Sequence, residues 1–488
     1  MAIKIYNSIT GKKEVFQPIE AGKVKMYACG VTVYDLCHIG HARQAVVYAM
    51  IADYLRYRGY EVKYVRNYTD VDDKIINRAN KEGKTALQLS SEQIAEAEKD
   101  MAGLHVTDAD IYTKASEYIE KIIIFIEDLI DQGYAYANEN GDVYFSVRKF
   151  KQYGKLSKRN VDELLNGVRK EVEEGKQEAL DFALWKSAKE GEIYWDSPWG
   201  KGRPGWHIEC SVMANDTLGT TIDIHGGGRD LIFPHHENEV AQSEAHNHAP
   251  LAKYWSHCGL IKINGEKMSK SLGNSLILRD VLTKYNYEVI KYMLLSKHYT
   301  SDIDINESDF QLAESHMYYF YKTLLMSQVY IDANYSEVCE NTNLSNDSND
   351  IEENFIQNMD DDFNTVSAFA SLFSIFKNLN SLLEKPKVDK NVVVVNIKNI
   401  LNSIKGTYGV IGFLNQDPQV FINEIKTKHL SILGLTEENI VAEIEKRLQA
   451  KKDKNYALAD KIRDDLEVKG IILKDNANTT EWDIKALY

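Results

Sequence analysis

The apolar positions near the amino terminus alternate between the periodicity of a buried strand and that of an amphipathic helix. Residues 24–29 (VKMYAC) form a short apolar run that ends at Gly30, which predicts a buried strand. In residues 41–58 the apolar side chains recur on one helical face, and Gly59 ends that pattern before a second strand-like run at residues 61–68. A strand, a helix and a strand in this length predict a right-handed crossover and therefore a parallel sheet.

The pattern changes several times further along the chain. Charged helical segments and a hairpin-like run at residues 142–147 predict an insertion, after which the strand pattern returns at residues 220–225. Beyond residue 310 the periodicity is helical, and a polar stretch that begins at Glu340 predicts a loop. We therefore expect an α/β domain with an insertion, followed by a helical part and a small carboxyl-terminal unit.

Composition narrows the kind of protein. The net charge of −15 counts against a nucleic acid partner, although phosphate contacts need only a local basic face. The five cysteines are widely spaced and do not form a disulfide framework, which suits a reducing compartment. The amino terminus has no hydrophobic signal core, and no apolar run approaches the roughly 18 residues of a membrane span. We therefore expect a cytoplasmic protein without a membrane partner.

The first candidate for chemistry is the word His38-Ile39-Gly40-His41, at the junction of the predicted strand and helix. The first turn of a helix favours anions, because backbone N–H groups and the helix dipole point outward there. The two histidines can then stabilise negative charge on a phosphate, and Gly40 lets a flat ring approach the backbone. The alternative is that this four-residue word arises by chance, which its position disfavours.

The second candidate is Lys267-Met268-Ser269-Lys270-Ser271, which follows a probable hairpin. Two lysines on a loop can neutralise a triphosphate during its reaction. Taken alone, Lys267 and Lys270 are better explained as a solvated surface. Their order after the His38–His41 word reverses that preference.

A third group is rich in the residue types that bind metals. His235 and Glu239 are four residues apart and share a helical face, and Cys29 and Cys210 offer two thiolates. The alternative for each cysteine is a small buried hydrophobe, and spacing alone leaves the two readings near even. The other histidines, namely His225, His236, His246 and His248, are expected to be ordinary core residues or outer-sphere partners.

The words at residues 38–41 and 267–271 together resemble the signature pair of class I aminoacyl-tRNA synthetases. That resemblance implies an α/β, Rossmann-type parallel-sheet catalytic domain with an insertion, a helical bundle and a carboxyl-terminal anticodon-binding domain. It also implies that ATP, with Mg2+, activates an amino acid, and that the histidines and Lys270 stabilise the transferred phosphate. The expected boundaries are 1–95 and 201–258 for the catalytic domain, 96–200 for the insertion, 259–310 for the region with the second word, 311–415 for the bundle and 416–488 for the anticodon domain.

Four longer motifs make the resemblance specific to the cysteinyl-tRNA synthetase family. They are CGVTVYDLCHIGH, GRPGWHIECS, FPHHENEVAQS and KMSKSLGN, in the family's usual order. The family resemblance implies one zinc ion held by Cys29, Cys210, His235 and Glu239 in the pocket for L-cysteine. A metal makes chemical sense there, because it binds a thiolate readily whereas a serine hydroxyl offers no comparable anion near neutral pH.

Four further residues are expected to line the substrate pocket. Trp206 is expected to close over the amino acid, with a plain core tryptophan as the alternative. Gly227 and Asp230 resemble the family's ribose-binding turn, and Asp230 has the alternative role of holding the α-amino group. Thr69 ends the second predicted strand and is expected to face the same crevice above the strand ends.

The resemblance also names the partners. It implies tRNA-Cys, read through the basic tail that includes Trp482, and it fits a monomer. Two alternatives stay open: a ligase that joins cysteine to an amino sugar, and a non-catalytic zinc- and RNA-binding relative. The first would lack an anticodon-reading tail, and the second predicts damage to His38, His41 or Lys270, all of which are intact.

Overall fold

The computed structural model describes residues 2–163, 175–263, 265–267, 275–335, 347–384, 389–475 and 479–487. They form two compact units between which the chain passes more than once. The first unit contains Met1–Leu282, Leu294–Ile305 and Ile356–Ala368, and the second contains Thr283–Met293, Asn306–Phe355 and Phe369–Tyr488.

A five-stranded sheet with parallel neighbours forms the centre of the first unit. Its spatial order is β11 (Ala252–Cys258), β10 (Ile222–Gly228), β3 (Lys23–Thr32), β4 (Glu61–Thr69) and β5 (Ile111–Lys114). The strands predicted at residues 24–29 and 61–68 are thus confirmed as β3 and β4, and they are parallel. The strand order reverses between β3 and β10, and such switch points of parallel sheets are where ligands bind, at the carboxyl ends of the strands.

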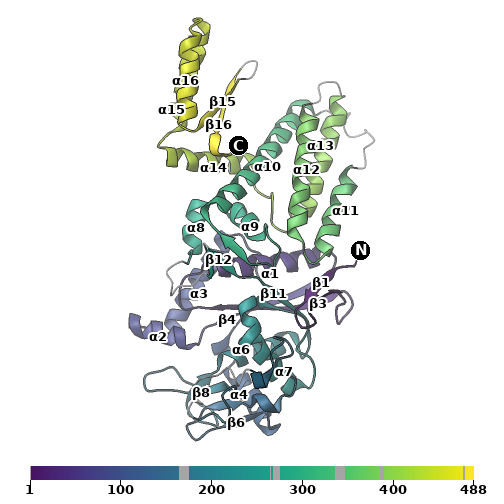
Figure 1. Ribbon diagram of the computed structural model, residues 1–488, viewed down its shortest axis with the longest axis vertical. Coiled ribbons are helices and arrows are strands. Elements are labelled where there is room, and N and C mark those ends of the chain that lie inside the picture. Colours follow the sequence, from purple (N-terminus) through teal and green to yellow (C-terminus); the bar gives the residue numbers. More distant parts are fainter. Residues whose placement is uncertain are drawn as a thin grey trace. The chain divides into compact units, whose positions relative to one another are not determined.

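Helices cover both faces of this sheet. α1 (Ile39–Tyr57) crosses from β3 to β4 on one face, and α6 (Trp206–Leu218) packs against the same strands from the other face (Figure 1). Buried side chains of α6 and of several other elements form one hydrophobic core, which includes Tyr27, Val65 and Trp255. The other helices are α2 (Asp73–Glu82), α3 (Ala86–Gly103), α4 (Ile119–Asp131), α7 (Glu237–Asn247) and α8 (Leu278–Lys284), which ends in the second unit.

Three smaller sheets belong to the first unit. The antiparallel sheet of β6 (Ala135–Ala137), β7 (Val143–Phe145), β8 (Phe182–Ser187) and β9 (Gly202–Pro204) lies where an insertion was expected. Its own core contains the fully buried Trp185 and apolar residues of α4. The other two are the hairpin of β1 (Lys4–Asn7) and β2 (Lys12–Val15), and the sheet of β12 (Ile261–Ile263), β13 (Glu266–Lys267) and β14 (Ile303–Ile305).

The second unit is mainly helical. It holds most or all of α9 (Tyr287–Leu295), α10 (Glu307–Asn334), α11 (Asp347–Asp360), α12 (Thr365–Leu383), α13 (Lys390–Thr407), α14 (Pro418–Leu433), α15 (Glu437–Lys452) and α16 (Tyr456–Val468), with a hairpin of β15 (Ile471–Asp475) and β16 (Thr480–Ile484). Aromatic rings join its helices, as where Phe320 of α10 packs on Phe376 of α12. Asn306 caps α10 and Asp417 caps α14, each through its side chain.

Helix α12 is long and apolar enough to cross a membrane. Its 19 residues include a window with a mean hydropathy of 1.2, although the sequence shows no uninterrupted apolar run of that length. One such helix does not distinguish a membrane span from the core helix of a soluble domain. The aromatic contacts with α10 are those of a helix that packs within a protein core.

A buried arginine of α1 joins the sheet to the segments that follow it. The Arg43 side chain is only 1% exposed, and its guanidinium donates to carbonyl oxygens of Gly259 at 2.8 Å and Ser301 at 2.6 Å. It also approaches the carbonyls of Leu260, His298 and Tyr299. The carbonyls of Leu260, His298 and Tyr299 also accept from backbone amides. The guanidinium is therefore the main donor to the carbonyls of Gly259 and Ser301.

We predict that Arg43→Met strongly destabilises the first unit. The substitution removes the guanidinium donor from the carbonyls of Gly259 and Ser301, and each buried carbonyl left unpaired costs about 1–3 kcal/mol. The matched control is Arg56→Met on the same helix, because Arg56 forms half-exposed ion pairs with Asp53 and Asp110, which contribute about 1 kcal/mol or less. Thermal melting followed by circular dichroism should show a much larger fall in Tm for Arg43→Met than for Arg56→Met. Equal falls in Tm would contradict this account.

Candidate active site and metal centre

The four expected metal ligands meet at the switch point of the sheet. Cys29 lies on β3 and Cys210 lies in the first turns of α6. His235 lies in the helical turn Ile232–His236 that leads into α7, and Glu239 lies in the first turn of α7. All four side chains are at most 3% exposed. The structure therefore brings together ligand types from three elements that are far apart in the chain.

Their spacing matches that of a tetrahedral metal site. Bonds of about 2.3 Å to sulfur and about 2.0 Å to nitrogen place two sulfurs roughly 3.8 Å apart, and sulfur and nitrogen roughly 3.5 Å apart. The Sγ atoms of Cys29 and Cys210 are 3.8 Å apart, and Cys29 Sγ lies 3.7 Å from His235 Nε2. Glu239 Oε1 lies 3.4 Å from Cys29 Sγ and 2.9 Å from His235 Nε2. The donor set and its geometry both fit a zinc ion.

The ionisation of these groups also suits a metal. Burial raises the pKa of Cys29, whereas a hydrogen bond from Cys29 lowers the pKa of Cys210 to about 6. Burial lowers the pKa of His235, but Glu239 and Cys210 together outweigh burial and raise that pKa to about 10. Because metal ligands must be deprotonated, an arriving cation displaces protons from this cluster.

Aromatic rings surround the cluster on the side of α6. Trp206 stacks on His235 with ring centroids 4.3 Å apart, and its side chain is 37% exposed. His207 lies beside both rings, and its Nδ1 is 2.9 Å from Nδ1 of His235. Trp206 is therefore not a fully buried core tryptophan, and its ring covers a side chain of the cluster.

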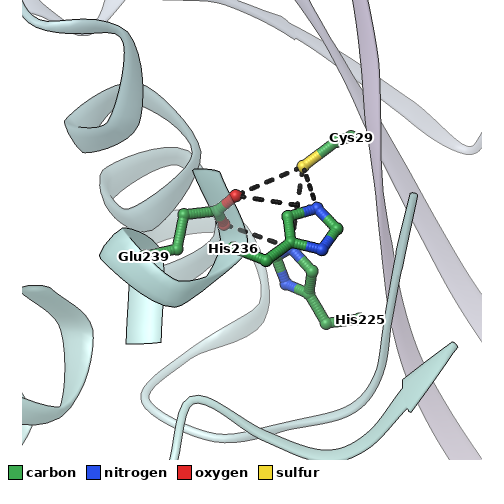
Figure 2. A group of neighbouring side chains, drawn as sticks. All are labelled: Cys29, His225, His236 and Glu239. Carbon is green, nitrogen blue, oxygen red and sulfur yellow. Dashed lines mark hydrogen bonds and ion pairs between the residues drawn. The ribbon is translucent and has the colours of Figure 1, made fainter. Parts of the chain in front are cut away.

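Two histidines that we expected to be ordinary core residues or outer-sphere partners contact the cluster directly. His225 on β10 and His236 at the start of α7 face Cys29 and Glu239, as Figure 2 shows. The paired histidines of the FPHHENE motif were the available signal for His236. His225 ends an apolar run, and nothing in that run indicates what its ring faces.

Gly227 has a structural reason to be a glycine. A Cβ at this position would lie 2.6 Å from the ring of His236, so a side chain would displace that imidazole. The Tyr48 hydroxyl accepts from Gly227 N at 2.7 Å and donates to Gly227 O at 2.9 Å, which holds the strand in place. This packing accounts for the residue independently of the ribose-binding turn expected there.

The His38–His41 word forms the start of α1. His38 is the N-cap, and its Nδ1 accepts from Gly40 N at 3.1 Å and His41 N at 3.3 Å, while His41 Nδ1 accepts from His38 N at 3.3 Å. The expectation of outward-facing N–H groups is therefore wrong for these two amides, because the His38 ring already accepts from them. The two imidazoles stack with centroids 3.6 Å apart.

Residues just before α8 are bonded to this same turn. Ile39 N donates to Leu276 O at 2.9 Å, and Leu278 N donates to Cys37 O at 2.9 Å. Lys270 lies outside the described residues, and of Lys267 the structure gives the backbone position in β13. The chain thus returns from the second signature word directly to the first.

The remaining substrate candidates lie in different environments. Thr69 is buried at the end of β4, where its hydroxyl is 3.4 Å from Asn67 Nδ2. Asp230 is exposed, in the short helical turn Arg229–Leu231 that follows β10. Glu209, for which we predicted no role, is fully buried, and neither of its carboxylate oxygens has a hydrogen bond among the described residues. Burial raises its pKa well above the usual value.

Comparisons with known proteins agree with this architecture. Residues 15–315 match the model for the catalytic domain of tRNA synthetases class I (C), and residues 354–414 match the DALR domain. The methionyl-tRNA synthetase of Mycobacterium tuberculosis, in complex with methionyl-adenylate, superposes with a TM-score of 0.57 at 13% identity, over 85% of this chain and 94% of that one. That likeness supports the predicted class I fold.

Full-length relatives specify the family. The chain is 48% identical to the cysteine–tRNA ligase of Thermodesulfovibrio yellowstonii and 47% identical to that of Geobacter sulfurreducens. Each match covers 99% of this chain and 100% of the relative. The chain therefore belongs to the cysteine–tRNA ligase family.

Proposed function

We propose that Cys29, Cys210, His235 and Glu239 hold the zinc ion through which this chain selects L-cysteine. The observation that carries the proposal is the tetrahedral spacing of two thiols, an imidazole and a carboxylate in a buried pocket. As a cysteine–tRNA ligase, the chain is an ATP-dependent, AMP-forming enzyme. Zinc bound there supplies a Lewis acid that favours the substrate thiolate over a serine hydroxyl.

The chain's own residues then serve the first reaction step. The cysteine carboxylate attacks the α-phosphate of ATP, and pyrophosphate leaves with Mg2+ as its counterion. We assign charge stabilisation at the phosphates to His38 and His41 at the positive end of α1, together with Lys267 and Lys270. In the second step a ribose hydroxyl at the 3′ end of tRNA-Cys attacks the adenylate, and AMP leaves.

Four residues complete the proposed substrate pocket. The stacking of Trp206 on His235 supports a role for Trp206 in covering the bound amino acid. We assign Thr69 to the same pocket because it ends β4 beside the switch point. Gly227 and Asp230 are assigned to the ATP ribose, and Asp230 has the alternative role of binding the substrate's α-amino group.

We assign tRNA-Cys recognition to the carboxyl-terminal part of the second unit. A groove of about 1490 Å³ there is lined by Trp482 and by charges of both signs, namely Lys322, Lys426, Lys474, Glu437, Glu438, Glu445, Glu481 and Asp483. Lys426 Nζ lies 4.2 Å from the centroid of the Trp482 ring. An aromatic ring beside a cation is suited to stacking on an unpaired base.

Several cations of the predicted basic tail have structural partners instead. Arg447 is buried and forms a bidentate pair with Asp475, which Lys451 also contacts. These side chains join α15 to β15, so we do not assign them to RNA binding. The tail and the DALR match disfavour the amino-sugar ligase.

We also propose that the protein is a cytoplasmic monomer without a membrane partner. The free thiols of Cys29, Cys37, Cys210 and Cys258 support a reducing compartment.

The central prediction concerns amino-acid-dependent exchange between ATP and pyrophosphate. Purified protein should support exchange with cysteine and not with serine, with a preference above the roughly 100-fold of an ordinary pocket for near-isosteres. Removal of zinc with a chelator should abolish the exchange, and zinc but not magnesium should restore it. Full exchange by metal-free protein would exclude the proposed role of the metal.

A second prediction separates catalysis from helix capping at His38. His38→Asn keeps an N-cap side chain, so the helix should remain stable within about 0.5 kcal/mol, whereas adenylate formation should fall about 100-fold or more. The control is Thr85→Ala at the N-cap of α3. This variant should lose about 1 kcal/mol of stability and keep full activity. A His38→Asn enzyme with normal exchange kinetics would show that the imidazole acts only as a cap.

A third prediction concerns Trp482. Trp482→Ala should raise the KM for tRNA-Cys about tenfold, because base stacking on an aromatic ring contributes about 1–3 kcal/mol. Exchange of pyrophosphate should not change, since that reaction needs no tRNA. The matched control is Tyr194→Ala, which removes an exposed aromatic side chain of the first unit. This variant should leave the KM for tRNA-Cys unchanged. An unchanged KM for tRNA-Cys would exclude the groove as the recognition site.

A further inference from the structure

His235 and His236 are neighbours whose rings are oriented in the same way. The Nδ1 of His235 is 2.9 Å from the His207 ring, and the Nδ1 of His236 is 2.8 Å from the His257 ring. In each case Nε2 faces the cluster, at 3.7 Å from Cys29 Sγ for His235 and 3.3 Å for His236. A metal-binding histidine is normally held by its other ring nitrogen in this manner. His236 is therefore as well prepared for a metal as His235.

His225 completes a second set of ligand types around Cys29 and Glu239. Its Nε2 lies 3.6 Å from Cys29 Sγ and 3.1 Å from Glu239 Oε2. Figure 2 shows the four side chains of this set. The Nδ1 of His225 is buried and has no hydrogen-bond partner among the described residues. The Glu239 carboxylate is fully buried beside this ring, and a buried carboxylate is costly unless a cation or an ionised partner compensates it.

The spacing of this inner set also fits a tetrahedral ion. For zinc, sulfur and nitrogen lie roughly 3.5 Å apart, and pairs of nitrogen or oxygen atoms roughly 3.3 Å apart. Cys29 Sγ lies 3.3 Å from His236 Nε2 and 3.6 Å from His225 Nε2, and the two histidines approach different oxygens of Glu239, at 3.1 Å for His225 and 3.9 Å for His236. One ligand atom from each of the four residues lies within 4.8 Å of the others. Cys29 as thiolate and Glu239 as carboxylate together balance a divalent charge.

We propose that Cys29, His225, His236 and Glu239 form a second, inner position for a zinc-class divalent ion. The inference rests on the metal-binding function proposed above and adds an overlapping position to it. One ion is held at a time, because the positions share Cys29 and Glu239. Two ions would bring four positive charges against three anionic ligands in a buried site. The inner position retains the ion when Cys210 does not bind it.

The test uses Co2+ alone as the probe, bound to the full-length metal-free chain. The intensity of the Co2+–thiolate charge-transfer band grows with the number of bound thiolates. The wild-type chain should therefore show the intensity expected for two thiolates. Cys210→Ser should still bind one Co2+ per chain, with about half of that band. Adding His236→Gln should then weaken Co2+ binding tenfold or more, whereas adding His235→Gln should change it less than about threefold. His246→Gln, on α7 and paired with Asp128, is the control.

A second measurement does not depend on the double variants. X-ray absorption of zinc-loaded Cys210→Ser should show one sulfur and two imidazoles from the inner set. One sulfur and one imidazole, or Co2+ binding that depends on His235 and not on His236, would overturn the inner position and leave the outer site intact. Loss of all binding in a Cys210→Ser protein with a normal circular dichroism spectrum would also overturn it. A wild-type chain that binds no metal would refute both positions.

Discussion

The full burial of the Glu239 carboxylate is the constraint on which the functional site depends. A charge removed from water must be compensated, and His225 and His235 lie at 3.1 Å and 2.9 Å from its oxygens. Those partners hold the pKa of Glu239 well below its usual range in spite of burial. The glycine at position 227, the start of α7 and the burial of Cys29 all follow from fitting these groups into one pocket.

Buried carboxylates organise other parts of the molecule in the same way. Glu237 accepts from the backbone amides of Gly154 and Ser157 and so fixes the insertion to α7. In the second unit, Glu288 accepts from Leu414 N at 2.9 Å and from the Tyr321 hydroxyl at 2.8 Å. Each of these acids satisfies backbone donors in a loop that has no regular partner. The acidic composition of the chain is therefore partly a property of its interior.

Local patterns predicted the elements better than the contacts between them. The strands at β3 and β4 and the helix between them follow from periodicity alone, because each reflects burial of one face. The pairing of Cys29 with Cys210 does not follow, since it requires β10 and α6 to return to β3 after the insertion. The spacing of these residues in the sequence did not distinguish metal ligands from ordinary buried cysteines. The family motifs decided in favour of a metal site. The contacts of His225 and His236 with Cys29 and Glu239 are compatible with the expected outer-sphere role, but a sequence does not show which ring nitrogen faces a neighbour.

The backbone pairing of residues 276–278 with residues 37–39 has an evolutionary consequence. A substitution that shifts the first turn of α1 also shifts the segment that returns from the second signature word. Effects of changes in contacting segments do not add, so a replacement accepted in one alters which replacements the other accepts. Residues 37–39 and 276–278 should therefore be inherited as an epistatic unit, although most of the catalytic domain separates them in the chain.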